Sequence, residues 1–379
     1  MKLKTIFPGA RAESLIISAV LILAVVAGLV LFVLQPKETF SQEENRVLQS
    51  FPAFDAEDLF AGKYTKKFET YLADQFPARN FFVGINCDVQ LLLQKEDVGG
   101  VYFGKDDYLF EILKQPDPDI LQSNLTGINS LADRTNLPVY LLPVPSSAQE
   151  MKERLPAYAP SYDQNLSVEA MEKNLSPKVT LVNVMDALKP RDGETLYFKT
   201  DHHWNVFGAY KGYSALMNAM GLNPVPISDI KFEKVTSDFY GTLYSKAGYK
   251  RQKPDEMYIQ QFKEPQQITC VSGGQTADSL FDMSKLDKKD QYTIYIGGNT
   301  DENIIRNAGA RGERILIIKD SYAHIAVPYL ANHFSEIRMI DLRYFRKDPV
   351  EYIRENQIDR IVILYSIKQL DEVVTLGDM

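Results

Sequence analysis

Residues 314–321 read Arg-Ile-Leu-Ile-Ile-Lys-Asp-Ser, a run of four large apolar residues that ends in a lysine, an acid and a hydroxyl. Such a run predicts a strand that is buried on both faces, and the pattern after it predicts a helix over 323–333. Other strand-like runs alternate with helix-like segments, at 138–143, 179–184, 337–341 and 360–364. This alternation predicts an α/β domain whose mostly parallel sheet is covered by helices on both faces.

A second apolar stretch, Ser14 to Leu34, holds 21 consecutive uncharged residues. Because about 20 helical residues cross the hydrocarbon core of a bilayer, we expect one transmembrane helix over 14–35. The positive residues Lys2, Lys4 and Arg11 precede the stretch, so we expect the N-terminus inside and the rest of the chain outside the cytoplasm. A cleaved signal peptide is the alternative, although its apolar region is normally only about 7–15 residues long. The sequence therefore predicts a single-pass protein of the cell membrane.

The rest of the chain divides by composition and periodicity. The predicted segments are a cytoplasmic N-terminus (1–13), the membrane helix (14–35), a linker (36–62) and an extracytoplasmic α/β domain (63–379) with an irregular insertion (221–290). Within the domain, helical periodicity at 63–73 and 78–94 predicts two helices, and apolar runs around a turn within 98–111 predict a hairpin.

Composition limits the classes of partner. The 379 residues carry a net charge of −8 at pH 7, which argues against nucleic acid because no basic face is implied. The chain has two cysteines, Cys87 and Cys270, which exclude a disulfide-rich scaffold and leave one bridge or two buried thiols as alternatives.

The segment Lys199-Thr200-Asp201-His202-His203-Trp204-Asn205 holds two of the four histidines and the only tryptophan, and a predicted helix over 205–220 follows. Asp201 and His203 are two residues apart. This spacing lets the carboxylate hold the imidazole Nδ1 and leaves Nε2 free as a base. The alternative is structural, with Thr200 or Asp201 capping the helix and the histidines packing in the core.

The neighbouring histidines also allow a metal site. Asp201, His202 and His203 are a possible ligand set for a metal hydrolase. However, adjacent side chains in an extended segment point to opposite faces, so we expect His202 to point away from His203 and no metal to be bound.

Ser321 is the predicted nucleophile. It follows the apolar strand at the start of a helix, so it would lie at the carboxyl end of the sheet, where ligand sites of α/β proteins gather. Backbone N–H groups at the helix start would stabilise an oxyanion, as in a nucleophile elbow. The alternative is that Asp320 and Ser321 only cap the helix.

A third element completes the predicted site. Residues 292–297 are expected to form a strand that ends in Gly297-Gly298-Asn299, and Gly298 and Asn299 are candidate oxyanion donors. A plain glycine turn is the alternative. Further oxyanion or substrate-binding candidates are Tyr240, Tyr322, His202 and Trp204.

These motifs resemble the bacterial DHHW protein family, which is similar to the SGNH-hydrolase-like domains of the alginate O-acetyltransferases. The matching stretches are Glu44-Asn45-Arg46 with Leu48, Asp74–Arg79, Val101–Lys105, Tyr197–Asn205, Phe239–Thr242 and Ile318–Ser321. The resemblance implies an SGNH-like three-layer α/β/α fold with Asp201 as acid, His203 as base and Ser321 as nucleophile. The chain departs from the family pattern at Lys319, where a glycine is usual, and at His202, where the alginate enzymes have threonine.

Motifs and resemblance together predict a serine O-acetyltransferase that acts on a cell-surface or secreted polysaccharide and needs no cofactor. An acetylesterase with the same triad and a non-catalytic glycan-binding or assembly subunit are the alternatives. Since activated acyl groups are made in the cytoplasm and one helix forms no protein-lined path, we expect a multi-spanning membrane acyltransferase as the acetyl-donating partner.

Overall fold

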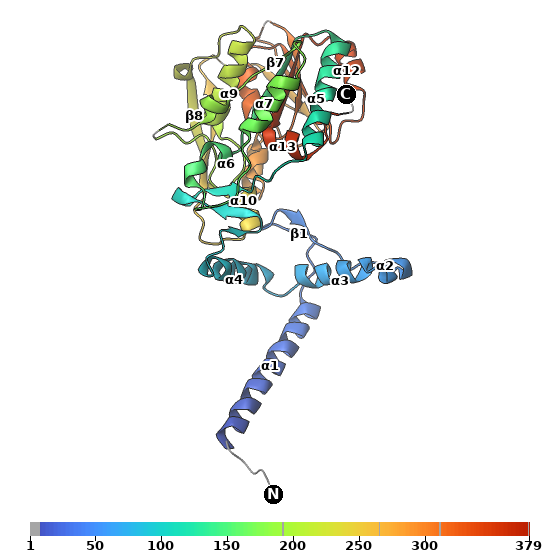
Figure 1. The fold of residues 1–379 in the computed structure, drawn as a ribbon, viewed down its shortest axis with the longest axis vertical. Coiled ribbons are helices and arrows are strands. Elements are labelled where there is room, and N and C mark those ends of the chain that lie inside the picture. Colours follow the sequence, from blue (N-terminus) through green and yellow to red (C-terminus); the bar gives the residue numbers. More distant parts are fainter. Residues whose placement is uncertain (1–7, 192, 265, 311, 378) are drawn as a thin grey trace. The chain divides into compact units, whose positions relative to one another are not determined.

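The computed structural model describes residues 8–191, 193–264, 266–310, 312–377 and 379. The chain forms two compact units, one up to Val89 and one from Gln90 onward (Figure 1). Residues 1–7 of the predicted cytoplasmic segment lie outside the described residues. The predicted domain boundaries stay a prediction.

Unit 1 begins with the long helix α1 (Pro8–Leu34), which contains the predicted membrane helix. Its 23 residues from Ala12 to Leu34 are long and apolar enough to cross a membrane, and the mean hydropathy over 18 consecutive residues of this stretch is 3.2. The other elements of unit 1 are β1 (Phe40–Ser41), β2 (Arg46–Val47), α2 (Ala56–Phe60), α3 (Lys63–Asp74) and α4 (Arg79–Leu92), whose last residues belong to unit 2. The two helices predicted after the linker are confirmed as α3 and α4.

Unit 2 is built on an eight-stranded mixed sheet with the strand order β11-β10-β12-β14-β13-β15-β6-β7. The five strands from β14 to β7 run parallel, as predicted, whereas β12, β10 and β11 extend one edge with antiparallel pairing. The strands are β6 (Val139–Val144), β7 (Val179–Leu181), β10 (Ile268–Ser272), β11 (Gln275–Ala277), β12 (Glu302–Asn307), β13 (Arg314–Lys319), β14 (Glu336–Ile340) and β15 (Arg360–Ser366).

Helices and two small sheets surround this sheet. The helices are α5 (Pro118–Thr135), α6 (Ser147–Glu150), α7 (Asn165–Asn174), α8 (Met185–Leu188), α9 (Val206–Ala219), α10 (Thr242–Ala247), α11 (Ala323–Leu330), α12 (Pro349–Glu355) and α13 (Ile367–Glu372). The small sheets are β3 (Asp97–Val98) with β4 (Val101–Phe103) and β5 (Leu109–Glu111), and β8 (Ile230–Phe239) with β9 (Asp255–Phe262). The predicted hairpin within 98–111 is confirmed as β4 and β5.

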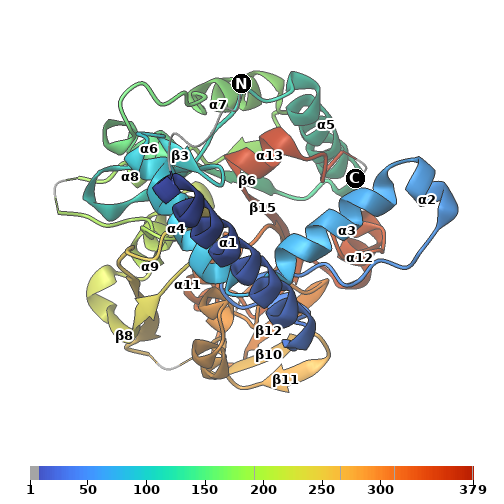
Figure 2. The ribbon, with the colours of Figure 1, turned by 90° about the horizontal axis from the view of Figure 1, so that it is seen from below.

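The central strand β13 is buried on both faces. Its residues Ile315 and Ile317 belong to a core that includes α9 and α11, whereas Leu316 and Ile318 belong to a second core that includes α5, α7, α12 and α13. Figure 2 shows α5, α7 and α13 gathered on one side of β6 and β15. Burying each of these side chains contributes roughly 1.5–3 kcal/mol, which is why an uninterrupted apolar run forms this strand.

Two predictions about local structure are wrong. Residues 292–297 do not form a strand, because Gln291–Ile294 is a 3₁₀ turn and Ile296 and the glycines after it have positive φ. Residues 221–290 are not irregular, since they contain the long β8–β9 hairpin as well as β10 and β11 of the central sheet. Charged residues on the exposed side of β8 and β9 mask the apolar periodicity that strand prediction needs.

Candidate active site

Ser321 lies on the turn between β13 and α11, at the carboxyl end of the central strand. The Asp320 carboxylate bonds to this turn with one oxygen and to the end of β15 with the other. Its Oδ1 accepts a hydrogen bond from the Tyr322 N–H (2.9 Å), and its Oδ2 accepts from the backbone and hydroxyl of Ser366 (2.8 and 2.9 Å) at the end of β15. The two neighbouring strand ends are therefore tied together directly under the serine.

His203 connects Ser321 to Asp201. The Nε2 atom of His203 lies 2.7 Å from the Ser321 Oγ, and its Nδ1 lies 2.5 Å from the Asp201 Oδ1. Asp201 and His203 are buried, whereas Ser321 is partly exposed. The structure therefore brings the three residues together as a hydrogen-bonded chain whose exposed end is the serine hydroxyl.

The Asp201 carboxylate is held by further donors. The His203 N–H donates to its Oδ1 (3.0 Å), and the Thr242 N–H at the start of α10 donates to its Oδ2 (2.7 Å). Burial raises the pKa of Asp201, but the two neighbouring histidines and these hydrogen bonds outweigh burial and hold the pKa well below its usual range. Asp201 is therefore ionised at neutral pH, and it orients His203 with the proton on Nδ1.

Aromatic rings hold the His203 imidazole in place. The Tyr292 ring stacks on it with 3.9 Å between centroids and 8° between planes, and its hydroxyl donates to the Ser321 carbonyl (3.0 Å). Burial raises the pKa of Tyr292 well above its usual value, so the hydroxyl stays a neutral donor. Tyr292 thus joins the base to the backbone of the nucleophile, a role that the incorrect strand prediction concealed.

The prediction that His202 points away from His203 is wrong. The two rings lie 3.9 Å apart, and the His202 Nδ1 is 3.4 Å from the same Asp201 oxygen that holds His203. The segment turns instead of running extended, so adjacent side chains fall on one side. Burial and the neighbouring His203 lower the pKa of His202 to about 4, so its ring is neutral at pH 7. One ligand atom from each of Asp201, His202 and His203 lies within 4.8 Å of the others, so the argument against a shared metal ion from side-chain direction does not hold.

Trp204 and Tyr322 are almost completely buried and pack beside the site. The Trp204 indole N–H donates to the Tyr322 carbonyl (2.9 Å), and the Tyr322 hydroxyl donates to the His202 carbonyl. A Cβ at Gly212 of α9 would lie 2.5 Å from the Trp204 ring, so this glycine makes room for the indole. These two aromatic residues therefore support the site from within the core.

Helix α9 is capped by Asn205 and not by Thr200 or Asp201. The Asn205 Oδ1 accepts from the N–H groups of Phe207 (2.9 Å) and Gly208 (3.2 Å). The alternative prediction that Thr200 or Asp201 caps α9 is therefore wrong, and the Asp201 carboxylate is bonded to His203 instead.

Sequence reasoning missed Asp255 and Gly241. The Asp255 carboxylate at the start of β9 accepts from the backbone N–H groups of Lys199 and Thr200 and from the Thr200 hydroxyl (2.6 Å). A Cβ at Gly241 would overlap the Asp201 side chain. Both residues lie in the stretch that sequence patterns described as irregular, and only Phe239–Thr242 carried a signal, through the family resemblance.

The candidate donors to an oxyanion lie on two turns, one with Gly298 and Asn299 before β12 and one with Ser321 between β13 and α11. The Asn299 Oδ1 accepts from the Lys319 Nζ (3.3 Å), which directs the other amide atom, the Nδ2 donor, away from the lysine. The Gly298 N–H makes a long bond to the Tyr295 carbonyl (3.5 Å). Within the part of the chain that the structure describes, the Ser321 N–H has no hydrogen-bond partner.

Tyr240 lies beside α10. Its ring is 4.4 Å from that of Tyr244, and the Lys289 ammonium lies over both rings. Among the described residues, Tyr240 makes no hydrogen bond or ring contact with Asp201, His203 or Ser321.

A cleft of about 620 Å³ is lined in part by Glu111 on β5, Lys246 on α10 and Lys368 on α13, and its lining residues do not include Asp201, His203 or Ser321. Two of the elements that line the cleft are hydrogen-bonded to the segment before Asp201. The Leu109 N–H of β5 donates to the Lys199 carbonyl (2.8 Å), and the Tyr244 N–H of α10 donates to the Thr200 carbonyl (3.0 Å). Burial raises the pKa of Glu111, but His202 and Lys368 outweigh this and hold it below its usual range.

The fold and the site define an α/β protein with a mixed sheet and a hydrogen-bonded chain of Ser321, His203 and Asp201 beside the end of the central strand. The family model described as DHHW protein matches residues 152–340, about half of the chain. The chain belongs to the DHHW protein family.

The chain is also similar to curated relatives and to solved structures. The chain is 27% identical over 213 residues to the probable alginate O-acetylase AlgJ of Pseudomonas putida, which covers 52% of this chain and 54% of the relative. The chain spans about half the length of the curated relatives it matches. A DHHW family protein from Eubacterium siraeum is similar in structure (TM-score 0.65, 21% identity, 74% of this chain and 95% of that one), as is Bacillus cereus PatB1 with a sulfonyl adduct (TM-score 0.62, 22% identity, 73% and 97%).

Proposed function

We propose that this protein is a membrane-anchored, extracytoplasmic serine O-acetyltransferase that modifies a cell-surface or secreted polysaccharide, on an SGNH-like three-layer fold. The observation that carries the proposal is the hydrogen-bonded chain from Asp201 through His203 to Ser321, with distances of 2.5 and 2.7 Å. The curated relatives are named as alginate O-acetylases, which supports transfer of an acetyl group to a polysaccharide.

In the first half-reaction, the Ser321 Oγ attacks the carbonyl carbon of an acetyl donor while the His203 Nε2 takes the hydroxyl proton. When the tetrahedral intermediate collapses, His203 returns that proton to the leaving oxygen of the donor. The product is an acetyl ester on Ser321. Asp201 stays ionised and stabilises the imidazolium that forms on His203.

In the second half-reaction, a sugar hydroxyl attacks the acetyl-serine. His203 takes the proton of the attacking hydroxyl and gives it to the Ser321 Oγ as the ester bond breaks, so the enzyme is regenerated. The free Ser321 N–H and the Asn299 amide nitrogen are the proposed donors to the developing oxyanion. We assign the cleft lined by Glu111, Lys246 and Lys368 to the acceptor sugar, because β5 and α10, which both contribute to its lining, are hydrogen-bonded to Lys199 and Thr200 directly before Asp201.

The acetyl group needs a source outside the cytoplasm. We propose that a multi-spanning membrane acyltransferase delivers it, because α1 alone forms no protein-lined path for a polar acyl carrier. In this arrangement α1 anchors the protein in the cell membrane with the N-terminus inside. An acetylesterase is the second candidate, since the same triad can pass the acetyl group to water instead of a sugar hydroxyl. A non-catalytic glycan-binding subunit remains the alternative from another class.

Intact mass spectrometry tests the acyl-enzyme. The purified protein is incubated with 4-nitrophenyl acetate, and the expected result is a mass gain of one acetyl group that fragmentation places on Ser321. The Ser321→Ala variant serves as the control and should gain no mass at this site. Acetylation at other residues only, with release of 4-nitrophenol unchanged in Ser321→Ala, would overturn the proposal.

A further inference from the structure

Large apolar side chains are exposed far more densely in unit 1 than in unit 2. Among the described residues beyond α1, twelve are exposed between 36 and 89, whereas nine are exposed between 90 and 379. The twelve are Phe40, Val47, Phe51, Phe54, Leu59, Phe60, Leu72, Phe76, Phe81, Phe82, Ile85 and Val89. Apolar side chains concentrated in this way mark a surface that binds something apolar.

On α4 these side chains share one face of the helix. Phe81, Phe82, Ile85 and Val89 follow the spacing i, i+1, i+4 and i+8, which places them within one stripe. Asn80 is also exposed but lies on the opposite side of the helix. Helix α4 is therefore amphipathic, and its apolar face is open.

Aromatic rings likewise cover one side of α3. Phe51 packs against Phe68 and Tyr71 with ring centroids 6.0 and 5.3 Å apart, and Phe54 packs against Tyr64 at 5.6 Å. Even in these contacts Phe51 and Phe54 remain 63% and 70% exposed. The polar positions of α3 carry the exposed lysines Lys63, Lys66 and Lys67. This combination of apolar aromatic residues with lysines is typical of helices that lie in a membrane interface.

Contacts at the end of α1 fix the position of these helices. The Phe32 ring in the last turns of α1 packs edge-on against Tyr71 of α3 (5.9 Å), and Gln35 donates a hydrogen bond to the Gln75 carbonyl after α3. A hollow of about 240 Å³ is lined by Pro36, directly after α1, together with Phe76 and Phe81. Figure 1 shows α3 lying across the end of α1 instead of continuing it.

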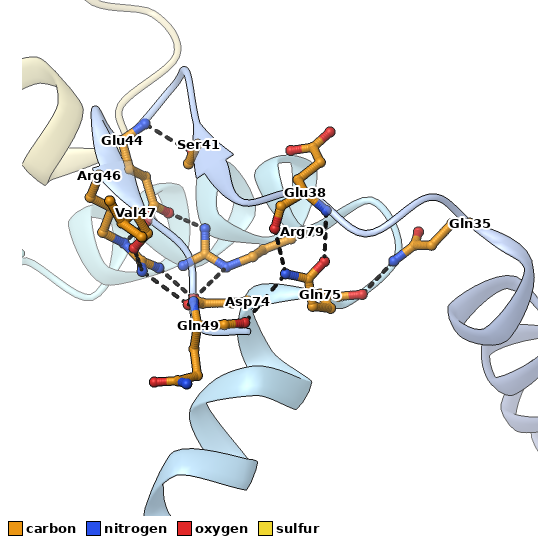
Figure 3. A network of polar contacts seen from close by, with 10 residues as sticks. All are labelled: Gln35, Glu38, Ser41, Glu44, Arg46, Val47, Gln49, Asp74, Gln75 and Arg79. Atoms are coloured by element: carbon orange, nitrogen blue, oxygen red, sulfur yellow. Dashed lines mark hydrogen bonds and ion pairs between the residues drawn. The ribbon is translucent and has the colours of Figure 1, made fainter. Parts of the chain in front are cut away.

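A network of hydrogen bonds and ion pairs connects the segments of this junction (Figure 3). The buried Asp74 at the end of α3 accepts from Arg46 (3.0 Å) and from the Gln49 N–H (2.8 Å), and Glu44 pairs with both Arg46 (2.6 Å) and Arg79 at the start of α4. Burial raises the pKa of Asp74, but Arg46 outweighs it and holds the pKa below its usual value, so the network stays charged. The segment between α1 and α4 is therefore held at one end by contacts with Phe32 and Gln35 and at the other by the ion pair of Glu44 with Arg79.

From these observations we propose that α3 and α4 lie in the interfacial layer of the same membrane that α1 spans, with the apolar stripe of α4 and the aromatic cover of α3 among the lipid chains. The bound partner is the lipid surface, and the lysines of α3 contact anionic headgroups. The proposal rests on the proposed anchoring by α1. It favours lipid over a second protein because the exposed surface is continuous with the end of the membrane helix.

Depth-dependent fluorescence quenching tests this inference on the full chain in vesicles of phosphatidylcholine and phosphatidylglycerol. An environment-sensitive maleimide is attached to an introduced cysteine in Phe81→Cys, Ile85→Cys, the matched control Asn80→Cys, and Val25→Cys within α1. The native Cys87 and Cys270 are buried, and the unsubstituted chain gives the background of their labelling. Quenchers are iodide in water and nitroxide-bearing lipids.

The expected result is that nitroxide lipids reduce the Phe81→Cys and Ile85→Cys signals about twofold or more, with little effect of iodide, and that Asn80→Cys behaves in the opposite way. If Val25→Cys is quenched by lipid but both α4 sites are quenched only by iodide, the interfacial proposal fails and the anchor stands. Protection of the α4 sites from both quenchers would show that protein covers this face, which also overturns the proposal. If Val25→Cys is not quenched by lipid, the anchoring itself is wrong.

Discussion

The Nε2 atom of His203 lies 2.7 Å from the Oγ of Ser321, although 118 residues separate the two positions in the chain. The parallel part of the sheet explains this contact. Ser321 follows β13, and the turn that carries it is bonded to the end of β15, so the serine is presented at the edge of the sheet where the segment from Thr200 to Asn205 also packs. A catalytic role for this pair leads to predictions that mutagenesis can test.

Replacing Ser321, His203 or Asp201 with alanine should each lower hydrolysis of a small acetyl ester at least ~10³-fold, because the three residues act as one unit. For the same reason the double variants should be little worse than the worst single variant. Initial rates and circular dichroism measure activity and folding, and Ser279→Ala, at an exposed serine, is the control.

Removing divalent metal ions with EDTA should leave the rate of the unsubstituted protein unchanged. Near-full turnover by Ser321→Ala would refute the nucleophile, and loss of activity in EDTA would favour a metal ion held by Asp201, His202 and His203.

His202 should matter less for the rate than the triad but should affect the pH dependence of stability. Its pKa is about 4 in the folded protein and about 6.5 in an unfolded chain, so the unfolded state binds more protons between these values. Stability therefore falls as the pH drops through this window. Between pH 7 and 5 the free energy of unfolding of the unsubstituted protein should fall by roughly 1–2 kcal/mol more than that of His202→Asn. Chemical denaturation at the two pH values measures this, and equal losses in both proteins would contradict a neutral, partly buried His202.

Lys319 should act on catalysis through Asn299. The Lys319 side chain is completely buried, and its ammonium contacts the Asn299 Oδ1 (3.3 Å), the His324 Nε2 (2.8 Å) and the Asp341 carboxylate (3.3 Å). The Lys319→Met variant keeps the size of the side chain but releases the Asn299 amide, so kcat should fall about tenfold or more with little change in KM.

The double variant separates this positioning role from simple destabilisation. Asn299→Ala alone should lower kcat by about 10²-fold, and Lys319→Met should add little to it, because the lysine then has no amide left to orient. Fully additive losses in kcat would show that Lys319 does not act through Asn299. Asp341 retains its pairing with Arg343 (2.6 Å) in both variants, so the carboxylate is not left without a cation.

Gly241 should tolerate no side chain. A Cβ there would overlap Asp201, so Gly241→Ala should displace the carboxylate from His203 and lower kcat about 10²-fold or more. The Gly309→Ala variant is the control, since its Cβ would meet only the end of the Asn307 side chain at 3.3 Å. Thermal unfolding reports stability alongside the rate. Full activity in Gly241→Ala would mean that Asp201 is not held where the structure places it.

Sequence patterns predicted the parallel strands and the Asp201–His203 pair because both depend on residues that are close in sequence. Ser321 was selected by its place after the apolar strand and by the family resemblance. The apolar run at 315–318 is long enough to indicate a strand buried on both faces, and Asp201 and His203 are close enough in sequence to suggest a bond. Tyr292, Asp255 and Gly241 were missed because their roles come from tertiary contacts. Tyr292 reaches His203 from a 3₁₀ turn that reads as a strand, and Gly241 matters only because Asp201 fills the space beside it.

The fate of the acetyl group separates the transferase from its alternatives in the living cell. A strain that lacks this protein should carry less acetate on its surface polysaccharide, because Ser321 then no longer passes acetyl groups to sugar hydroxyls. The measurement is acetate released by mild base from purified polysaccharide, normalised to total sugar. The unsubstituted chain should restore the acetate, whereas Ser321→Ala, which keeps the cleft beside Lys199 and Thr200, should not. A reproducible rise in acetate in the deletion strain would support the esterase, since the same triad would then be removing acetyl groups. Restoration by Ser321→Ala would show that the protein binds or assembles the glycan machinery without forming an acyl-enzyme.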